Sequence, residues 1–200
     1  MDTPRRELLV NTAAAIGLTG AAGVAGCLDF AAGEGPQGPD GTPAALSCAD
    51  DEFGRLAQPF EEPVSETSVD APSTTFELSA EGTAETYGQP IRLALRNSGG
   101  ASGATLGEYA YAIQRQTVDG WSDVRGSTTG VAAEDLAAET TLDVGSSYSW
   151  SLRLTESAIG SAVPDHELEV CPALGPGTHR FVYWGIVDAP PIGVEFDLVG

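Results

Sequence analysis

The stretch from residue 147 to residue 154, SYSWSLRL, decides the fold. Its large side chains occupy every second position and alternate with serine and arginine. Successive side chains of a β-strand point to opposite faces, so the stretch is expected to form a half-buried strand. Trp150 is in phase with Leu152 and Leu154, and we expect its side chain to lie in the core.

Six further segments show the same alternation or a strand-like composition, and glycine or proline turns separate them. Asp119-Gly120 is a hairpin signal, and Pro190-Pro191 ends a strand. Two short helical turns are expected at residues 49–56 and 155–163. Seven strands without a long helix predict an all-β, antiparallel β-sandwich. The six segments are 75–78, 91–95, 109–116, 121–125, 178–187 and 192–198.

The chain is strongly acidic. Its 200 residues contain 9 Lys+Arg against 29 Asp+Glu, for a formal net charge of −20, and all the basic residues are arginines. Nucleic-acid binding needs clustered cations, so this composition argues against a nucleic-acid partner. Acidic runs such as residues 50–52 lack the alternating spacing of a calcium loop and are expected to be solvated surface.

The N-terminus carries an export pattern. Arg5 and Arg6 precede a weakly apolar stretch that ends in Val24-Ala25-Gly26-Cys27. The stretch is too weak for a membrane span, but it suits a twin-arginine signal. The last four residues resemble the lipobox of exported lipoproteins. That resemblance implies cleavage before Cys27, lipidation of Cys27, and a protein anchored on the extracellular face of the membrane. An uncleaved helix with a chance cysteine is the alternative.

The acidity and the signal together resemble exported lipoproteins of halophilic archaea. Cleavage before Cys27 would leave 200 − 26 = 174 residues with 7 basic and 27 acidic side chains, a charge of 7 − 27 = −20. Molar salt shortens the Debye length to about 3 Å and screens such repulsion. An acidic secreted protein from a moderate environment is the alternative interpretation.

Three parts are expected along the chain: a signal peptide at 1–26, a lipidated Gly/Pro-rich tether at 27–72, and a β-sandwich domain at 73–200. Three motifs in the domain resemble bacterial immunoglobulin-like domains, which implies that type of sandwich. His179 stands where these domains usually carry tyrosine. Intracellular proteinase inhibitors are a weaker likeness. The motifs are YGQPIRLALRN at 87–97, YAIQRQTVDGW at 111–121 and LGPGTHRF at 174–181.

Once lipid is assigned to Cys27, Cys48 and Cys171 remain. Two cysteines in an exported chain usually pair, so we expect a disulfide between them. Two free thiols are the alternative, and a catalytic thiol has no activating motif nearby. Zinc is disfavoured, because no paired Cys or His spacing occurs.

The sequence offers no catalytic, cofactor-binding or metal-binding set. His166 and His179 stand alone, and neither a nucleophile motif nor a phosphate loop is present. Trp184 is out of phase with Phe181 and Tyr183, so it is a candidate ligand-contact residue if it is partly exposed. The alternative is that Trp184 packs under a loop.

The expected function is a membrane-anchored, non-enzymatic binding or structural module with an unknown protein or polysaccharide partner. The alternative is an inhibitor of exported proteases, for which the loops at 101–107 and 128–139 would enter the protease cleft. An enzyme of unrecognised type is the third hypothesis.

Overall fold

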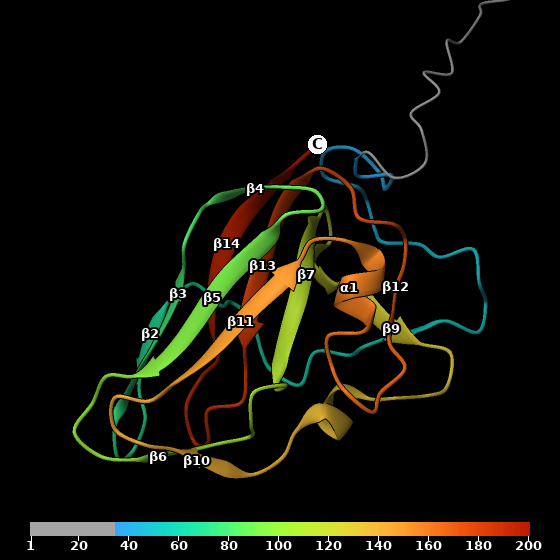
Figure 1. Ribbon diagram of the computed structural model, residues 1–200. Helices are drawn as coiled ribbons and strands as arrows, with labels where there is room; N and C mark the ends of the chain where they lie inside the picture. Colours follow the sequence, from blue (N-terminus) through green and yellow to red (C-terminus); the bar gives the residue numbers. More distant parts are fainter. Residues whose placement is uncertain (1–34) are drawn as a thin grey trace, which may run out of the picture. The chain divides into compact units, whose positions relative to one another are not determined.

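The computed structural model describes residues 35–200, and these form two large β-sheets packed face to face (Figure 1). One sheet has the strand order β11-β5-β3-β2, and the other has the order β4-β14-β13-β7-β8. All neighbours in these sheets are antiparallel except β4 and β14. The predicted all-β, antiparallel sandwich is therefore confirmed. The four-stranded sheet consists of Ser68–Asp70 (β2), Thr75–Ala80 (β3), Pro90–Asn97 (β5) and Ser147–Arg153 (β11). The five-stranded sheet consists of Ala84–Thr86 (β4), Tyr111–Thr117 (β7), Gly120–Asp123 (β8), Gly177–Tyr183 (β13) and Ile192–Val199 (β14).

Two small sheets and two helical turns complete the described part of the chain. The small sheets have the orders β1-β9-β12 and β10-β6. Thr155 begins the short helix α1, because its side chain accepts a hydrogen bond from the backbone N–H of Ala158 at 3.4 Å. The remaining elements are Gly54–Arg55 (β1), Gly103–Thr105 (β6), Arg125–Ser127 (β9), a 3-10 turn at Ala133–Leu136, Thr140–Leu142 (β10), Glu156–Gly160 (α1) and Glu169–Val170 (β12).

An aromatic cluster joins the two large sheets. Trp150 of β11 lies 5.0 Å from Phe181 and 6.0 Å from Tyr111, measured between ring centroids. Its indole N–H donates to the carbonyl of Glu108 at 2.9 Å. Trp150 is thus a core residue, as its phase in the sequence predicts, and the hydrogen bond satisfies its one polar group.

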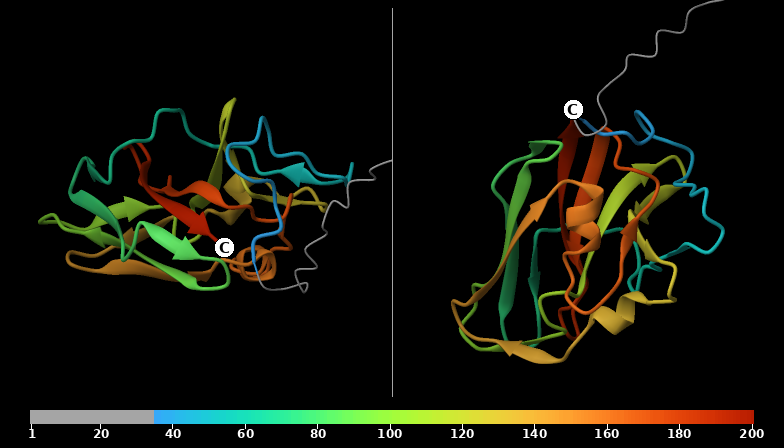
Figure 2. Two further views of the ribbon diagram at one scale, coloured as in Figure 1. Left: turned by 90° about the horizontal axis from the view of Figure 1, so that it is seen from above. Right: turned by 45° about the vertical axis from the view of Figure 1, so that its right-hand side comes forward.

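The chain between residues 35 and 66, which we call the N-terminal arm, covers the outer face of the five-stranded sheet. In the view from above, the arm lies on the opposite side of β13 and β14 from β5 and β11 (Figure 2). Leu56 and Val64 of the arm are buried. Because this sheet has cover on both faces, β13 is buried along Arg180, Phe181 and Val182 without alternation.

The arm corrects one expectation about domain organisation. Residues 27–72 are expected to form a flexible tether, yet from residue 35 onward the chain packs on the sandwich, and residues 68–70 form β2. Gly38 donates its N–H to the carbonyl of Leu174 at 2.7 Å, for example. The expected helical turn at 49–56 is a turn followed by β1. The predicted signal peptide and Cys27 lie outside the described residues.

Candidate functional site: the clasp of the N-terminal arm

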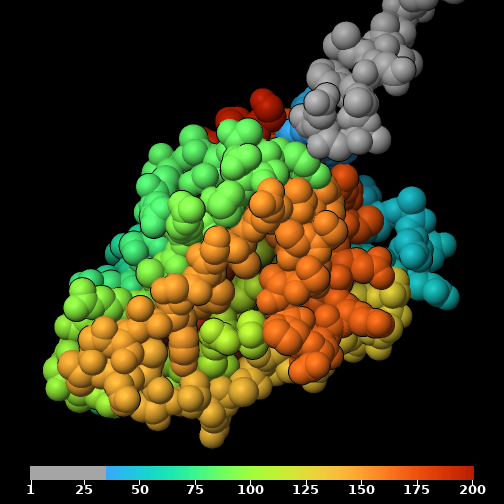
Figure 3. Space-filling model, in the orientation of Figure 1, coloured from blue at the N-terminus to red at the C-terminus, as the bar shows by residue number. Residues whose placement is uncertain are grey.

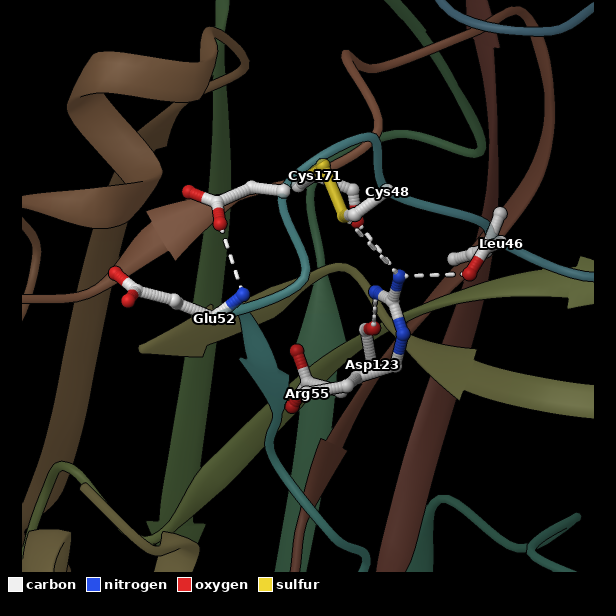
Figure 4. Close-up of a disulfide and its surroundings, with 7 residues drawn as sticks. Leu46, Cys48, Glu52, Arg55, Asp123 and Cys171 are labelled. Atoms are coloured by element: carbon white, nitrogen blue, oxygen red, sulfur yellow. Dashed lines mark hydrogen bonds between the residues drawn. A yellow bond between two sulfur atoms is a disulfide. The ribbon is translucent and has the colours of Figure 1, made fainter. Parts of the chain in front are cut away.

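The N-terminal arm is fastened to the sandwich by one disulfide and by arginines. The disulfide joins Cys48 to Cys171, as the sequence predicts, with 5.6 Å between the Cα atoms (Figure 4). It links the arm to the residue that directly follows β12, across a sequence separation of 123 residues. We call the disulfide and the arginines that bind the arm the clasp.

Arg55 lies beside the disulfide and binds three backbone carbonyls around it (Figure 4). Its guanidinium donates to the carbonyls of Leu46 at 2.9 Å, Cys171 at 2.7 Å and Asp123 at 2.6 Å. Burial lowers the pKa of Arg55, and the nearby charge of Asp123 opposes that effect. Arginine stays protonated in proteins, so this group remains a cation that joins three separate segments.

Arg115 holds the beginning of the arm through backbone carbonyls. It lies on β7, is 1 % exposed, and donates to the carbonyls of Pro39, of Gly41 at 2.9 Å and of Pro176 at 2.8 Å. Burial lowers its pKa, while Asp40 raises it. Gly175 is required beside it, because an added Cβ would lie 2.1 Å from the Arg115 guanidinium.

Arg180 holds the end of the arm from the outer face of β13. Its guanidinium lies 4.3 Å from the ring centroid of Trp121 and donates to the side chain of Gln114 at 2.6 Å. It also forms an ion pair with Glu62 and donates to the carbonyl of Val64 at 3.3 Å. The two arm residues are therefore bound to a planar cation that is itself stacked on an aromatic ring.

A buried ion pair lies next to the clasp, because one of its residues, Asp123, also accepts a hydrogen bond from Arg55. Arg125 and Asp123 have side chains that are 1 % and 4 % exposed, and their closest contact is 2.9 Å. Nε and one terminal nitrogen of Arg125 reach the two carboxylate oxygens of Asp123. Burial lowers the pKa of Arg125, but the charge and hydrogen bonds of Asp123, with a smaller contribution from the Tyr111 side chain, outweigh it, and the pKa is raised. Arg125 also donates to the backbone carbonyl of Tyr111 at 2.5 Å. The backbone carbonyl of Asp123 is the one that accepts the hydrogen bond from Arg55.

The role of these arginines could not be predicted from the sequence. Their signal is weak, because a single arginine in a strand looks like an outward-facing residue. Arg115 sits in the run YAIQRQT, of which six residues are buried. When both faces of a strand are covered, an arginine on either face of it is buried.

The structure corrects the expectation for Trp184. Its side chain is 9 % exposed, so it is a buried residue and does not present a ligand-contact surface. It follows β13 directly, where both faces of the sheet are covered, and strand phase therefore does not decide its exposure. The packing alternative is the one observed. Cys27, Arg5 and Arg6 lie outside the described residues.

His179 is buried as a neutral ring. It is 1 % exposed, its Nδ1 lies 2.9 Å from the carbonyl of Gly177, and it stacks on Phe196. Burial lowers its pKa to about 4, a backbone hydrogen bond with Gly177 opposes this, and the charge of Arg115 adds to the lowering.

This burial makes the stability of the domain sensitive to acid. Between its ordinary pKa of 6.5 and about 4, the unfolded chain binds a proton at this ring and the folded chain does not. The contribution is complete above pH 6.5, is lost progressively as the pH falls from 6.5 to about 4, and is absent below that. We expect His179→Gln to lose about 2–3 kcal/mol less free energy of unfolding than the parent between pH 7 and pH 4.5. Urea titrations of both proteins measure this difference. Equal losses would contradict a buried, neutral His179.

Within residues 35–200, no three His, Cys, Asp or Glu side chains gather closely enough to hold a metal ion. No helix in the part of the chain that the structure describes is long and apolar enough to cross a membrane. His166 borders an open hollow together with Glu156, Glu167 and Glu169.

Comparisons with known proteins add little. No protein-family model matches the chain, and no curated protein matches it. Among solved structures, a mutant β-glucosidase from Listeria innocua in complex with laminaribiose aligns at 15% identity over 80% of this chain and 22% of its own, with a TM-score of 0.32. The complex of Listeria innocua β-glucosidase with isofagomine aligns at 16% identity over the same shares, with a TM-score of 0.31. This chain thus spans about a fifth of the length of these enzymes.

Proposed function

We propose that the protein is an exported lipoprotein, anchored through Cys27 to the extracellular face of the cell membrane. Its β-sandwich serves there as a non-enzymatic binding or structural module of immunoglobulin-like type, and its acidic surface suits a halophilic setting. The proposal joins the export pattern in the sequence to one structural observation, which is the clasp.

The clasp supports the proposal because it fixes the N-terminal arm to the sandwich, and the arm is the segment that would connect the sandwich to a lipid on Cys27. An added Cβ on Gly200 would lie 2.7 Å from Pro36, and Arg115 binds the carbonyls of Pro39 and Gly41. The arm thus joins the sandwich at the end that also holds the C-terminus (Figure 1). Cys27 and Gly35 are only 35 − 27 = 8 positions apart, so the domain could stand no more than about 28 Å from its lipid.

The protease-inhibitor alternative receives less support. An inhibitory loop must be exposed to enter a protease cleft. The suspected loop at 101–107 contains β6, in which Thr105 is buried, and the loop at 128–139 contains the 3-10 turn, in which Leu136 is buried. Both loops also have exposed residues, eight of the twelve in 128–139, and this exposure is the only observation that favours the alternative.

Replacement of Cys27 by Ser tests the anchor. We expect the parent protein in the membrane fraction and the Cys27→Ser protein outside it, because the lipid is the only anchor proposed. A Cys48→Ser/Cys171→Ser variant is the matched control, since it also replaces cysteines by serine but keeps the lipidation site, and it should remain in the membrane. Replacement of Arg5 and Arg6 by Lys should separately stop export. A Cys27→Ser protein that stays fully in the membrane would refute the anchor.

A further inference from the structure

The edge strand β11 differs from the other strand edges of the sandwich. The large sheets end in β11 and β2, and in β4 and β8. The last three have three or four residues. β2 and β4 carry the acids Asp70 and Glu85, whereas the acid of β8, Asp123, is buried in its ion pair with Arg125. Short length and charge protect an edge against pairing with another chain. β11 has seven residues, SYSWSLR, with no acid, no proline and no charge before Arg153.

The free edge of β11 presents backbone groups to solvent. Asn97 donates its N–H to the carbonyl of Ser146, and Leu154 donates to that of Gln89, both at 3.0 Å. In an antiparallel ladder, the residues that bond to the neighbouring strand alternate with residues whose groups point away. Ser147, Ser149 and Ser151 are the residues that point away from β5. Within the described residues, their N–H and C=O groups have no backbone partner.

The surface beside this edge concentrates the exposed positive charge. Arg92, Arg96 and Arg153 are the exposed arginines of residues 35–200, and all three lie on the outer face of β5 and β11. Neither strand contains an acid, although Arg92 forms an exposed ion pair with Glu81 at 3.2 Å and Arg96 lies opposite Glu77 of β3. Arg92 pairs with Ser151 in register, and Arg96 with Ser147. A strand added beside β11 would lie about 10 Å from β5, and only short serines would separate its carboxylates from these arginines.

The inner side of the same edge has a hollow. Figure 3 shows β11 as a ridge with a hollow on the side away from β5. A hollow of about 360 Å³ next to Tyr148 is lined in part by Leu106, Leu136 and Ala138. Every second side chain of an added strand would point toward this layer. Apolar side chains fit the apolar part of its lining, which Glu108 and Thr140 border.

We propose that β11 accepts an extended segment of another protein as an additional strand, with apolar residues toward the hollow and acidic residues toward the arginines. This proposal rests on the binding-module function and names its partner. Main-chain hydrogen bonds would supply affinity, and the alternating side chains would supply selectivity. The lipid anchor is not involved in the binding step, so the two proposals fail independently.

The test measures binding of synthetic heptapeptides to the full chain purified in detergent. The first peptide alternates Val and Glu, the second alternates Val and Lys, and the third is a scramble of the first. We expect the Val-Glu peptide to bind at least 10-fold more tightly than the other two. Hydrogen exchange should show protection of the Ser147, Ser149 and Ser151 amides on binding.

Two variants at one position isolate the backbone contribution. Ser149→Ala and Ser149→Pro both lose the hydroxyl, but only proline removes the outward N–H, which an edge strand tolerates. We expect Ser149→Ala to bind as the parent does and Ser149→Pro to bind at least 10-fold more weakly. If Ser149→Pro does not fold, the amide protection in the parent still decides. Equal binding by both folded variants, unprotected amides, or pairing of β11 with a second copy of the chain would overturn the proposal.

Discussion

Asp123→Asn is expected to lower the free energy of unfolding by about 3–5 kcal/mol, because it leaves the buried Arg125 without its counter-charge. The pair is almost fully enclosed, and the carboxylate receives two side-chain hydrogen bonds and the backbone N–H of Arg125. Asparagine keeps the shape but not the charge, so the loss measures electrostatics more than packing. Chemical denaturation at one fixed, high salt concentration is the measurement.

A double variant distinguishes the cost of an unpaired buried charge from the cost of changing residue 123 itself. Asp123→Leu with Arg125→Met replaces the pair by apolar side chains, and such replacements are often neutral or stabilising. We expect the double variant to be more stable than Asp123→Asn. A single variant that loses less than about 1 kcal/mol would show that Asp123 does not neutralise Arg125 in the interior.

Removal of the disulfide by Cys48→Ala with Cys171→Ala is the second large effect. The bridge closes a loop of more than a hundred residues, so chain entropy predicts a loss of up to about 5 kcal/mol. Arg115 and Arg180 do not depend on the sulfur atoms, and we therefore expect the arm to remain bound in the folded variant. Denaturation gives the stability, and hydrogen exchange at the Gly38 amide, which bonds to Leu174, reports on the arm.

Reduction of the parent protein is the matched control for that variant. A reductant should lower the parent's stability to that of the double alanine variant and should leave the variant unchanged. A parent protein that is equally stable with and without reductant would mean that the bridge contributes nothing to the fold.

The long strands could be predicted from the sequence, whereas the short ones could not. All seven predicted strands exist, because an alternation such as Tyr148, Trp150 and Leu152 repeats often enough to be recognised. Elements of two or three residues, such as β1 and β4, contain too few positions to show a period. Their position in the sheet depends on the neighbouring strand, and the sequence of a short element carries no information about that partner.

The clasp could be predicted only in part. The disulfide followed from counting the cysteines, but the arm looked like a linker because glycine and proline dominate it. Its order comes from Arg115 and Arg180, which lie 61 to 118 positions away from most of the groups they bind. Such contacts leave no pattern in the arm itself. Trp184 was misjudged for a similar reason, since strand phase assumes that one face of the sheet is open.

The clasp also affects how the net charge is distributed between the surface and the interior. Seven arginines follow residue 27, and Arg55, Arg115, Arg125 and Arg180 are drawn into the fold. The exposed surface of the described region therefore has three arginines against most of the acids. The outer surface is more one-sided than the formal charge suggests, which agrees with a domain suited to high salt.

The most direct test of the anchored-lipoprotein account is the mass of the N-terminal peptide of the protein isolated from its own membranes. The account predicts a chain that begins at Cys27, with a lipid on the thiol. A chain that still begins at Met1, or a mature peptide with an unmodified Cys27, would contradict it.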